Sequence, residues 1–162
     1  MGGTGRGIRM EELILEIDIS GQIQQLNYDS VIGCMRNDGL KRSSFLSSEI
    51  KKNIIKKYRG QVINIIEKLH CILIYYCIKD ILENVKKIII CRDINFRIVK
   101  NLLPLLFKEN NYLKDIKINQ RDTLSEDSLG HKVAIKTFRK KKYADIVLKE
   151  EMVENVLFEF KK

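Results

Sequence analysis

The sequence predicts an α/β fold: a mixed β-sheet with antiparallel first three strands and helices on both faces. Three strand candidates precede the first helical pattern, and the later strand candidates alternate with helices. Strands joined through helices pair in parallel, whereas consecutive strands joined by short turns form an antiparallel meander. The chain has 162 residues, 44% of them apolar, which suits one domain and excludes a disordered chain.

The three N-terminal strands are predicted over residues 13–19, 28–36 and 40–46. The last two flank the tripeptide Asn-Asp-Gly, which is typical of a hairpin turn. The remaining elements, in chain order, are a helical region over 50–84 broken near Gly60, a strand over 86–93, a helix over 94–108 kinked at Pro104, a strand over 115–120, a polar loop over 121–130 and a helix over 141–158.

The composition also limits where the chain acts. The longest apolar run covers residues 72–77, whereas a membrane-spanning helix needs about 20 residues, so no membrane partner is expected. Four cysteines without a CxxC pair sit among apolar residues, which indicates buried thiols in a reducing compartment, the cytoplasm, and no zinc site. No secretory signal is expected. Residues 1–10, rich in glycine, are interpreted as an expression-derived or disordered leader before a single domain over 11–162.

The charge is strongly basic and unevenly distributed. Thirty lysines and arginines against 21 acids give a net charge of +9. The excess is concentrated in segments 49–59 and 131–142. Such segments gain affinity for phosphate backbones through counterion release, although a solvated lysine-rich face is the alternative for either one.

Two aspartates stand at unusual places in the predicted strands. Asp18 lies inside the apolar run of the first strand, and Asp93 closes the strand over 86–93 just before a helix. Functional groups gather at strand ends in α/β sheets, and carboxylates that meet there favour a hard cation such as Mg²⁺ or Mn²⁺. The structural alternatives are a helix N-cap for Asp93 and, for Asp18, a turn-side residue bonded to the backbone near Ser20 and Gly21.

The order of these residues resembles the ribonuclease H-like superfamily. The resemblance rests on an aspartate in the first strand of the meander, a second acid on the following helix and an aspartate closing the fourth strand. The motifs GHK and YADIV, with His131 and Asp145, are similar to the family's mobile-loop histidine and its last acid at a helix start. The first-strand sequence IDISG is also similar to an archaeal branch of that superfamily. The resemblance covers nearly the whole chain from Met10 onward and implies a ribonuclease H-like mixed sheet.

The resemblance also implies a set of metal ligands. Asp18 is the ligand shared by two divalent ions, Asp93 completes the first site and Asp145 holds the other ion. Glu67 is the preferred helix acid because it shares a face with apolar residues, where a carboxylate needs a partner. Glu49, nearer the helix start, is the alternative, as a ligand or as a capping acid.

Two further side chains have ordinary roles as alternatives. The resemblance implies that His131 assists proton transfer or product release. The alternative is an ordinary surface histidine after a glycine turn. Asp145 is otherwise a solvent-facing residue among nearby lysines. His70, inside the second half of the helical region, is expected to be a structural histidine with partners in the fold.

The function that the resemblance implies is a divalent-metal-dependent nuclease that hydrolyses phosphodiester bonds, for example of RNA in RNA/DNA hybrids. The alternative is a catalytically inactive ribonuclease H-like domain that binds nucleic acid or protein. A restriction-type nuclease core has only the tripeptide Asp-Ile-Lys at 115–117 in its favour. The cations expected to bind the nucleic-acid backbone are Lys51, Lys52, Lys56, Lys132, Lys136, Arg139 and Lys140.

Overall fold

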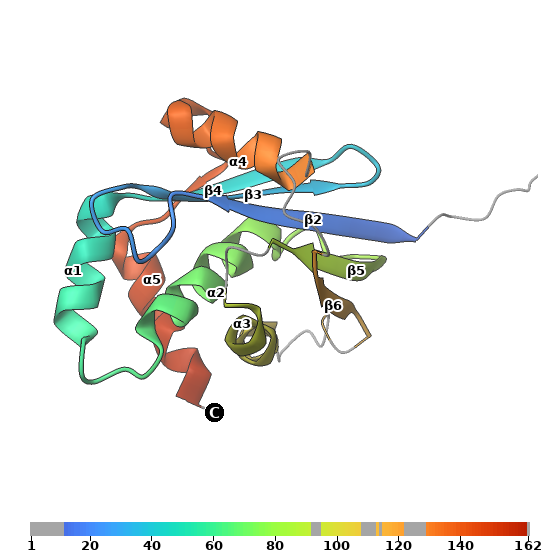
Figure 1. Ribbon diagram of the computed structural model, residues 1–162. Helices are drawn as coiled ribbons and strands as arrows, with labels where there is room; N and C mark the ends of the chain where they lie inside the picture. Colours follow the sequence, from blue (N-terminus) through green and yellow to red (C-terminus); the bar gives the residue numbers. More distant parts are fainter. Residues whose placement is uncertain (1–11, 92–94, 108–112, 114, 122–128, 162) are drawn as a thin grey trace, which may run out of the picture.

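The computed structural model describes residues 12–91, 95–107, 113, 115–121 and 129–161, and its centre is a six-stranded sheet in the order β6-β5-β2-β3-β4-β7 (Figure 1). The strands are β2 (Leu13–Ser20), β3 (Ser30–Arg36), β4 (Lys41–Leu46), β5 (Val85–Ile90), β6 (Lys117–Gln120) and β7 (Ile146–Val147). The helices are α1 (Ser48–Tyr58), α2 (Ile65–Ile78), α3 (Phe96–Leu102), α4 (Leu129–Arg139) and α5 (Glu150–Leu157), with 3₁₀ turns η1 (Leu103–Phe107), η2 (Lys141–Tyr143) and η3 (Phe158–Lys161). The predicted α/β class is confirmed.

The first three strands form the predicted antiparallel meander. β2 pairs with β3 and β3 with β4 in antiparallel register, so Asp18, Gly33 and Ser43 lie in one row across the sheet. β5 returns beside β2 in parallel, and β6 and β7 extend the two edges, also in parallel. The sheet is therefore mixed, as the alternation of strands and helices predicted.

Helices cover both faces of this sheet. α4 packs on one face against β2 and β3, and α2 packs on the other face against β3 and β4 (Figure 1). α1, α3 and α5 lie on the α2 side. Along β2 the alternation of strand side chains sends Leu15, Ile17 and Ile19 into the α2 core and Asp18 toward α4.

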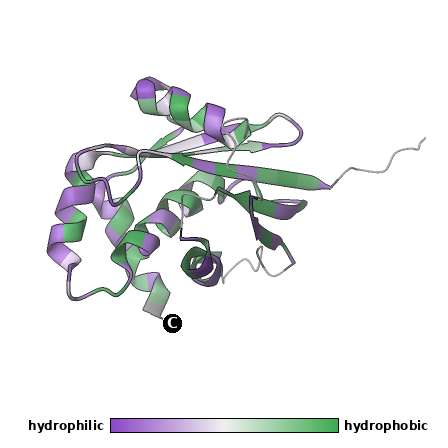
Figure 2. Ribbon diagram, viewed as in Figure 1, coloured by the Kyte–Doolittle hydropathy of each residue, from purple (hydrophilic) through white to green (hydrophobic). Residues whose placement is uncertain are grey.

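α2 carries the central part of the core. Its sequence is apolar almost throughout, and eight of its residues are buried (Figure 2). The apolar side chains are therefore not confined to one narrow stripe, as is typical of a buried helix. All four cysteines are free and buried, as expected from their apolar neighbours. Among the described residues, no helix combines the length and hydropathy needed to cross a bilayer.

The break predicted near Gly60 is confirmed. Gly60 has a φ of +84°, and the chain then reaches α2 through Asn64, which also adopts the left-handed conformation. α1 begins at an N-cap, where the Ser47 side chain accepts a hydrogen bond from the Ile50 backbone N–H. α5 docks against α1 through Glu154, which accepts hydrogen bonds from Lys57 Nζ and the Tyr58 hydroxyl.

The helix predicted over 141–158 is confirmed in its second half, where α5 lies, and is wrong in its first half. The segment is divided into η2, β7 and α5, because its backbone pairs with the edge of β4 before the last helix begins. The Asp145 N–H donates to Ser43 O at 3.1 Å and the Leu148 N–H donates to Phe45 O at 2.8 Å. α4 was not predicted, and it begins within the segment expected to be a loop.

Candidate functional site

Asp18 is a buried carboxylate in the middle of the sheet. Its Oδ2 lies 3.5 Å from Nδ1 of His131 on the first turn of α4, and its Oδ1 accepts the backbone N–H of Ile19 at 2.8 Å. The residue is 5% exposed. The bond to the Ile19 N–H, next to Ser20, agrees with the structural alternative of a carboxylate bonded to the backbone near this turn.

Close packing of α4 on the sheet brings His131 to this carboxylate. A Cβ on Gly130 would lie 2.7 Å from Glu16 O and 3.0 Å from Asp18 N, and a Cβ on Gly33 would lie 2.3 Å from Ala134 N. The distances of 2.7 Å at Gly130 and 2.3 Å at Gly33 are shorter than real Cβ atoms show, so glycine is required on each surface. The glycine before His131 therefore determines how near the imidazole comes to Asp18.

Asp145 is placed at the edge of the sheet and not at a helix start. Its Oδ2 accepts the backbone N–H of Ser43 at 2.8 Å, and its own N–H donates to Ser43 O. The carboxylate thus satisfies a backbone donor of β4 that has no strand partner at this position. Asp145 is also exposed, as the alternative of a solvent-facing residue expected, and its role as a metal ligand stays a prediction.

The structure separates Asp145 from Asp18. Asp18 pairs with Gly33 and Gly33 with Ser43, so Asp18 and Ser43 are two strands apart, about 10 Å between backbones. Asp145 lies on the far side of β4. Two oxygens bound to one divalent ion lie within about 4.5 Å of each other. These two carboxylates do not reach one shared ion.

Glu67 also lies apart from Asp18. It is in the first turn of α2, the helix on the opposite face of the sheet from α4. Burial raises the pKa of the Cys71 thiol and Glu67 adds to this effect; Cys71 in turn contacts the carbonyl of Val99 in α3. Glu67 therefore faces toward α3. The alternative acid, Glu49, is exposed in the first turn of α1.

Asp93 lies outside the described residues, so its predicted role stays a prediction. Among the residues that are described, no three His, Cys, Asp or Glu side chains come together in a group that could hold a metal ion. The described part of the chain therefore does not fit a two-metal centre by itself. The pair Asp18 and His131 is the part of the expected set that the structure brings together.

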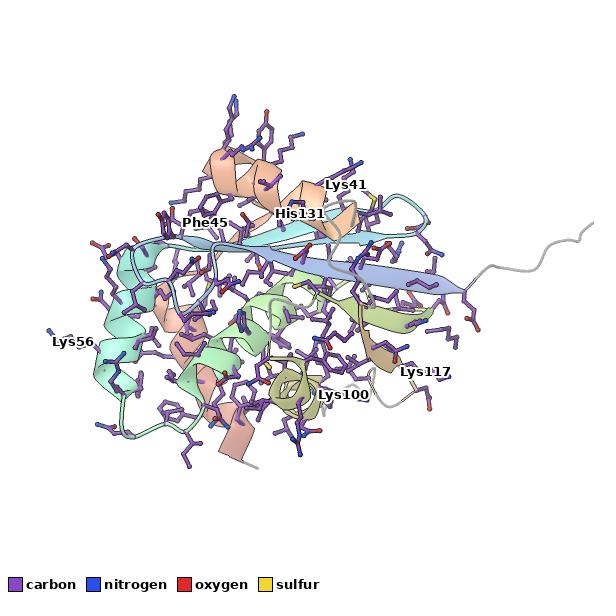
Figure 3. The ribbon with its side chains drawn as sticks, in the orientation of Figure 1. Lys41, Phe45, Lys56, Lys100, Lys117 and His131 are labelled. Atoms are coloured by element: carbon purple, nitrogen blue, oxygen red, sulfur yellow. The ribbon has the colours of Figure 1, made fainter. Side chains whose placement is uncertain are left out.

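A cation-lined cleft of about 310 Å³ lies on the α4 side of the sheet. Lys41 of β4 and Lys132 and Lys136 of α4 line it, together with Tyr143 and Asp145. Lys136 Nζ lies 4.4 Å from the centroid of the Tyr143 ring, and this ring is exposed. Figure 3 shows Lys41 and His131 on the same side of the sheet.

More cations surround this cleft. Arg139, Lys140, Lys141 and Lys142 follow at the end of α4 and in η2, and all four are exposed. The next acid along the chain, Asp145, accepts a hydrogen bond from the Ser43 backbone N–H. The surface formed by Lys41, Lys132, Lys136, Arg139, Lys140, Lys141, Lys142 and Tyr143 is called the α4 basic surface below.

Lys51 is a correction to the expected phosphate contacts. Its side chain is fully buried, with Nζ donating to Gln22 O at 3.2 Å, Gln25 O at 2.8 Å and Ser30 Oγ at 2.9 Å. Burial lowers the pKa of this ammonium to about 8, with Asp29 opposing the shift. Lys51 anchors the turn between β2 and β3 and does not reach a nucleic acid.

The other two predicted phosphate contacts of the first basic segment, Lys52 and Lys56, are exposed on α1. α1 lies on the α2 side of the sheet, and Figure 3 shows Lys56 far from Lys41 and His131. The two basic segments therefore do not form one continuous surface around Asp18.

His70 does not have the partners expected for it. It is 2% exposed, and neither ring nitrogen has a hydrogen-bond partner among the described residues. Burial, assisted by the nearby Lys51 ammonium, lowers the pKa of His70 to about 4, so the ring is neutral at physiological pH.

Comparison with known proteins gives no relative. No protein-family model, no curated protein and no solved structure matches the chain. Inferences about the function of this chain therefore depend on its own residues and their geometry. Sequence reasoning missed Lys41 and Tyr143, because the cleft forms only when α4 packs beside β4; the amphipathic spacing of 129–139 was the signal available for it.

Proposed function

We propose that this chain is a ribonuclease H-like domain that binds the phosphate backbone of a nucleic-acid duplex, such as an RNA/DNA hybrid, through the α4 basic surface. The observation that carries the proposal is the cleft lined by Lys41, Lys132 and Lys136, in which Lys136 Nζ lies against the exposed ring of Tyr143. The antiparallel first three strands, with β5 parallel beside the first, support the fold assignment.

The chemistry of this surface suits phosphate more than bases. Lysine and arginine release counterions when they bind a polyanion, so affinity falls with salt by a slope of about 0.9 per phosphate contact on duplex DNA. Contacts to phosphates position a protein without reading sequence. A binder of this kind is expected to accept duplexes of many sequences.

Binding is tested by fluorescence anisotropy with a labelled RNA/DNA hybrid, double-stranded RNA and double-stranded DNA across a salt series. The double variant Lys132→Gln/Lys136→Gln is expected to weaken binding about ten-fold or more and to lower the salt slope by about two phosphate contacts. The matched control is Lys52→Gln/Lys56→Gln, which removes the same charge from α1. Equal losses in both variants, or no binding by the unchanged protein, contradict the proposal.

A second candidate is hydrolysis of the bound nucleic acid, with Mg²⁺ or Mn²⁺ as cofactor. The contact of the buried Asp18 carboxylate with His131 favours it, because a carboxylate that orients an imidazole is a common arrangement in general acid–base catalysis. The site lies beside the α4 basic surface, since Ser43 of the cleft is in the same cross-sheet row as Asp18.

Two measurements separate the nuclease from the binding domain. Addition of Mn²⁺ or Mg²⁺ raises the melting temperature of a metal-binding protein, and Asp18→Asn is expected to abolish that rise. Cleavage of a labelled hybrid is then assayed with Asp18→Asn and Asp93→Asn as controls. Binding without metal stabilisation and without cleavage leaves the inactive nucleic-acid-binding domain.

A further inference from the structure

The cleft within the α4 basic surface has all its described walls on one side of the sheet. Gly33 of β3 faces Ala134 of α4, and Ser43 of β4 is the register partner of Gly33. Met35 lies two residues after Gly33 and pairs with Lys41, so both share that face. The other wall comes from α4, through Lys132, Val133, Lys136 and Thr137. The described lining therefore surrounds one space between β4 and α4.

This cleft is too small for a duplex. Its volume is about 310 Å³, at the lower end of the range of about 300–1,000 Å³ for small-molecule pockets. The major groove of a duplex alone is about 12 Å wide. A bound duplex can only lie across the rim, where Lys132 and Lys136 are exposed, whereas one unpaired nucleotide is of the size that fits inside.

Tyr143 gives the cleft an aromatic surface at a fixed place. Its backbone is held on two sides, because its N–H donates to Lys140 O at 3.0 Å and its carbonyl accepts the Ser43 hydroxyl at 3.2 Å. The residue is 42% exposed. Unpaired bases stack on exposed aromatic rings with little regard to sequence, since every base has a π-face.

Two cations lie beside this ring. Lys136 Nζ is 4.4 Å and Lys142 Nζ is 5.3 Å from the centroid of Tyr143. Both lysines are exposed and have long, flexible side chains, so a base can replace either ammonium on the ring while the phosphate of the same nucleotide binds that ammonium. An aromatic ring and cations side by side are the two parts of a single-strand binding site.

The remaining lining suits a base more than a phosphate. Met35 and Val133 are half-buried and offer apolar contact. Asp145 lies at the same cleft, with its Oδ2 accepting the Ser43 N–H at 2.8 Å. A carboxylate repels a phosphate but accepts hydrogen bonds from the amino groups of bases. The phosphate is therefore expected at the rim and the base inside.

We infer that the cleft between β4 and α4 binds one unpaired nucleotide next to a duplex, with its base against Tyr143 and its phosphate at Lys132 and Lys136. The preferred ligand is then a duplex with a single-stranded extension. This inference rests on the proposed function, because the α4 basic surface holds the duplex part. It adds a choice among nucleic acids that phosphate contacts alone do not give.

Fluorescence anisotropy tests this with a blunt RNA/DNA hybrid and the same hybrid carrying a short single-stranded extension at its 3′ or its 5′ end. The readout is the ratio of the two dissociation constants. At least one extended hybrid is expected to bind about five-fold or more tightly than the blunt hybrid, as one stacked base provides. An abasic extension of equal length is the matched ligand, because it has the same charge without the bases, and it is expected to lose this gain.

The variant Tyr143→Leu is expected to bring the ratio to about one. Tyr28→Leu is the matched control, because Tyr28 is 57% exposed and precedes β3 at the end away from Met35. Thermal unfolding establishes that both variants are folded. Blunt binding with a ratio near one, an abasic extension that binds as tightly as the natural one, or equal effects of the two substitutions overturns the inference alone. Absence of binding to every hybrid overturns both the inference and the proposed function.

Discussion

Gly33 and Ala134 hold the sheet and α4 in backbone contact. A Cβ on Gly33 would lie 2.3 Å from Ala134 N and 2.7 Å from Ala134 Cα. These are backbone atoms, so no side-chain rotation relieves the overlap. The contact determines how closely α4 approaches β3, and therefore where His131 and the lysines of the same helix stand relative to Asp18 and β4.

Gly33→Ala is therefore expected to destabilise the protein by about 3 kcal/mol, because α4 must shift away from the sheet. Gly39→Ala is the matched control: an added Cβ there meets no atom within 4 Å, and the φ of +96° alone costs about 1 kcal/mol. Urea unfolding measures both. Equal costs for the two variants contradict the tight packing of α4.

His70 is expected to make the protein acid-sensitive. Its pKa is about 4 in the native state against an ordinary 6.5, so the unfolded chain takes up the proton first as the pH falls. The stability that depends on the neutral ring is complete above pH 6.5 and is lost as the pH falls toward 4, by about 3 kcal/mol in total.

The comparison of the unchanged protein with His70→Leu isolates this effect. At pH 7.5 the variant is expected to equal or exceed the original stability, because neither ring nitrogen has a hydrogen-bond partner to lose. Between pH 6.5 and 4 the variant gains relative to the original. Parallel stability curves for the two proteins contradict a buried neutral histidine.

β2, β5 and α2 were predictable because the local hydropathy of each segment indicates that it is buried. β2 and β5 are apolar runs bounded by polar residues, and α2 is apolar nearly all round, so periodicity and length sufficed. The apolar residues around β7 are spaced as in a helix. The segment forms a strand only because it pairs with the free edge of β4, which is far away in the sequence.

The site was less predictable for the same reason. α4 has an amphipathic spacing, but the residues that it buries, Gly130, Ala134 and Thr137, are small, so hydropathy does not show how closely it packs on the sheet. The face of Glu67 within its helix could be read from spacing, but which side of the sheet that helix covers could not. Asp145 was expected to bind metal from the resemblance, and nothing local in the sequence shows that it accepts the Ser43 N–H.

Lys51 is expected to give a pH effect of the same sign as His70, in a higher pH range. Its native pKa is about 8, below the ordinary 10.5, so between these values the unfolded chain binds more protons and the free energy of unfolding rises with pH. Lys51→Met removes this rise. At pH 7 it is expected to cost about 2 kcal/mol, because the acceptors Gln22 O, Gln25 O and Ser30 Oγ lose their donor.

Chemical unfolding of both proteins from pH 7 to 10.5 checks this. The stability lost by the variant is expected to grow as the pH rises, and Lys52→Met, an exposed neighbour, serves as the control. A loss that shrinks with pH, or a control that behaves as Lys51→Met does, contradicts the buried ammonium.

Variants of Asp145 distinguish a structural role of its carboxylate from the role of a metal ligand. If its carboxylate serves the backbone of Ser43, Asp145→Ala costs about 1–2 kcal/mol of stability, since a half-buried N–H loses its acceptor. Asp145→Asn keeps an acceptor oxygen and removes a negative charge from the cleft of Lys41, Lys132 and Lys136, so the affinity of this variant for a duplex is expected to increase.

If Asp145 is a metal ligand, the reverse is expected for Asp145→Asn: loss of stabilisation by Mn²⁺ and loss of cleavage. Anisotropy titration of Asp145→Asn, beside a melting curve with and without Mn²⁺, decides between the two roles, because only the structural role allows tighter binding together with an unchanged response to the metal.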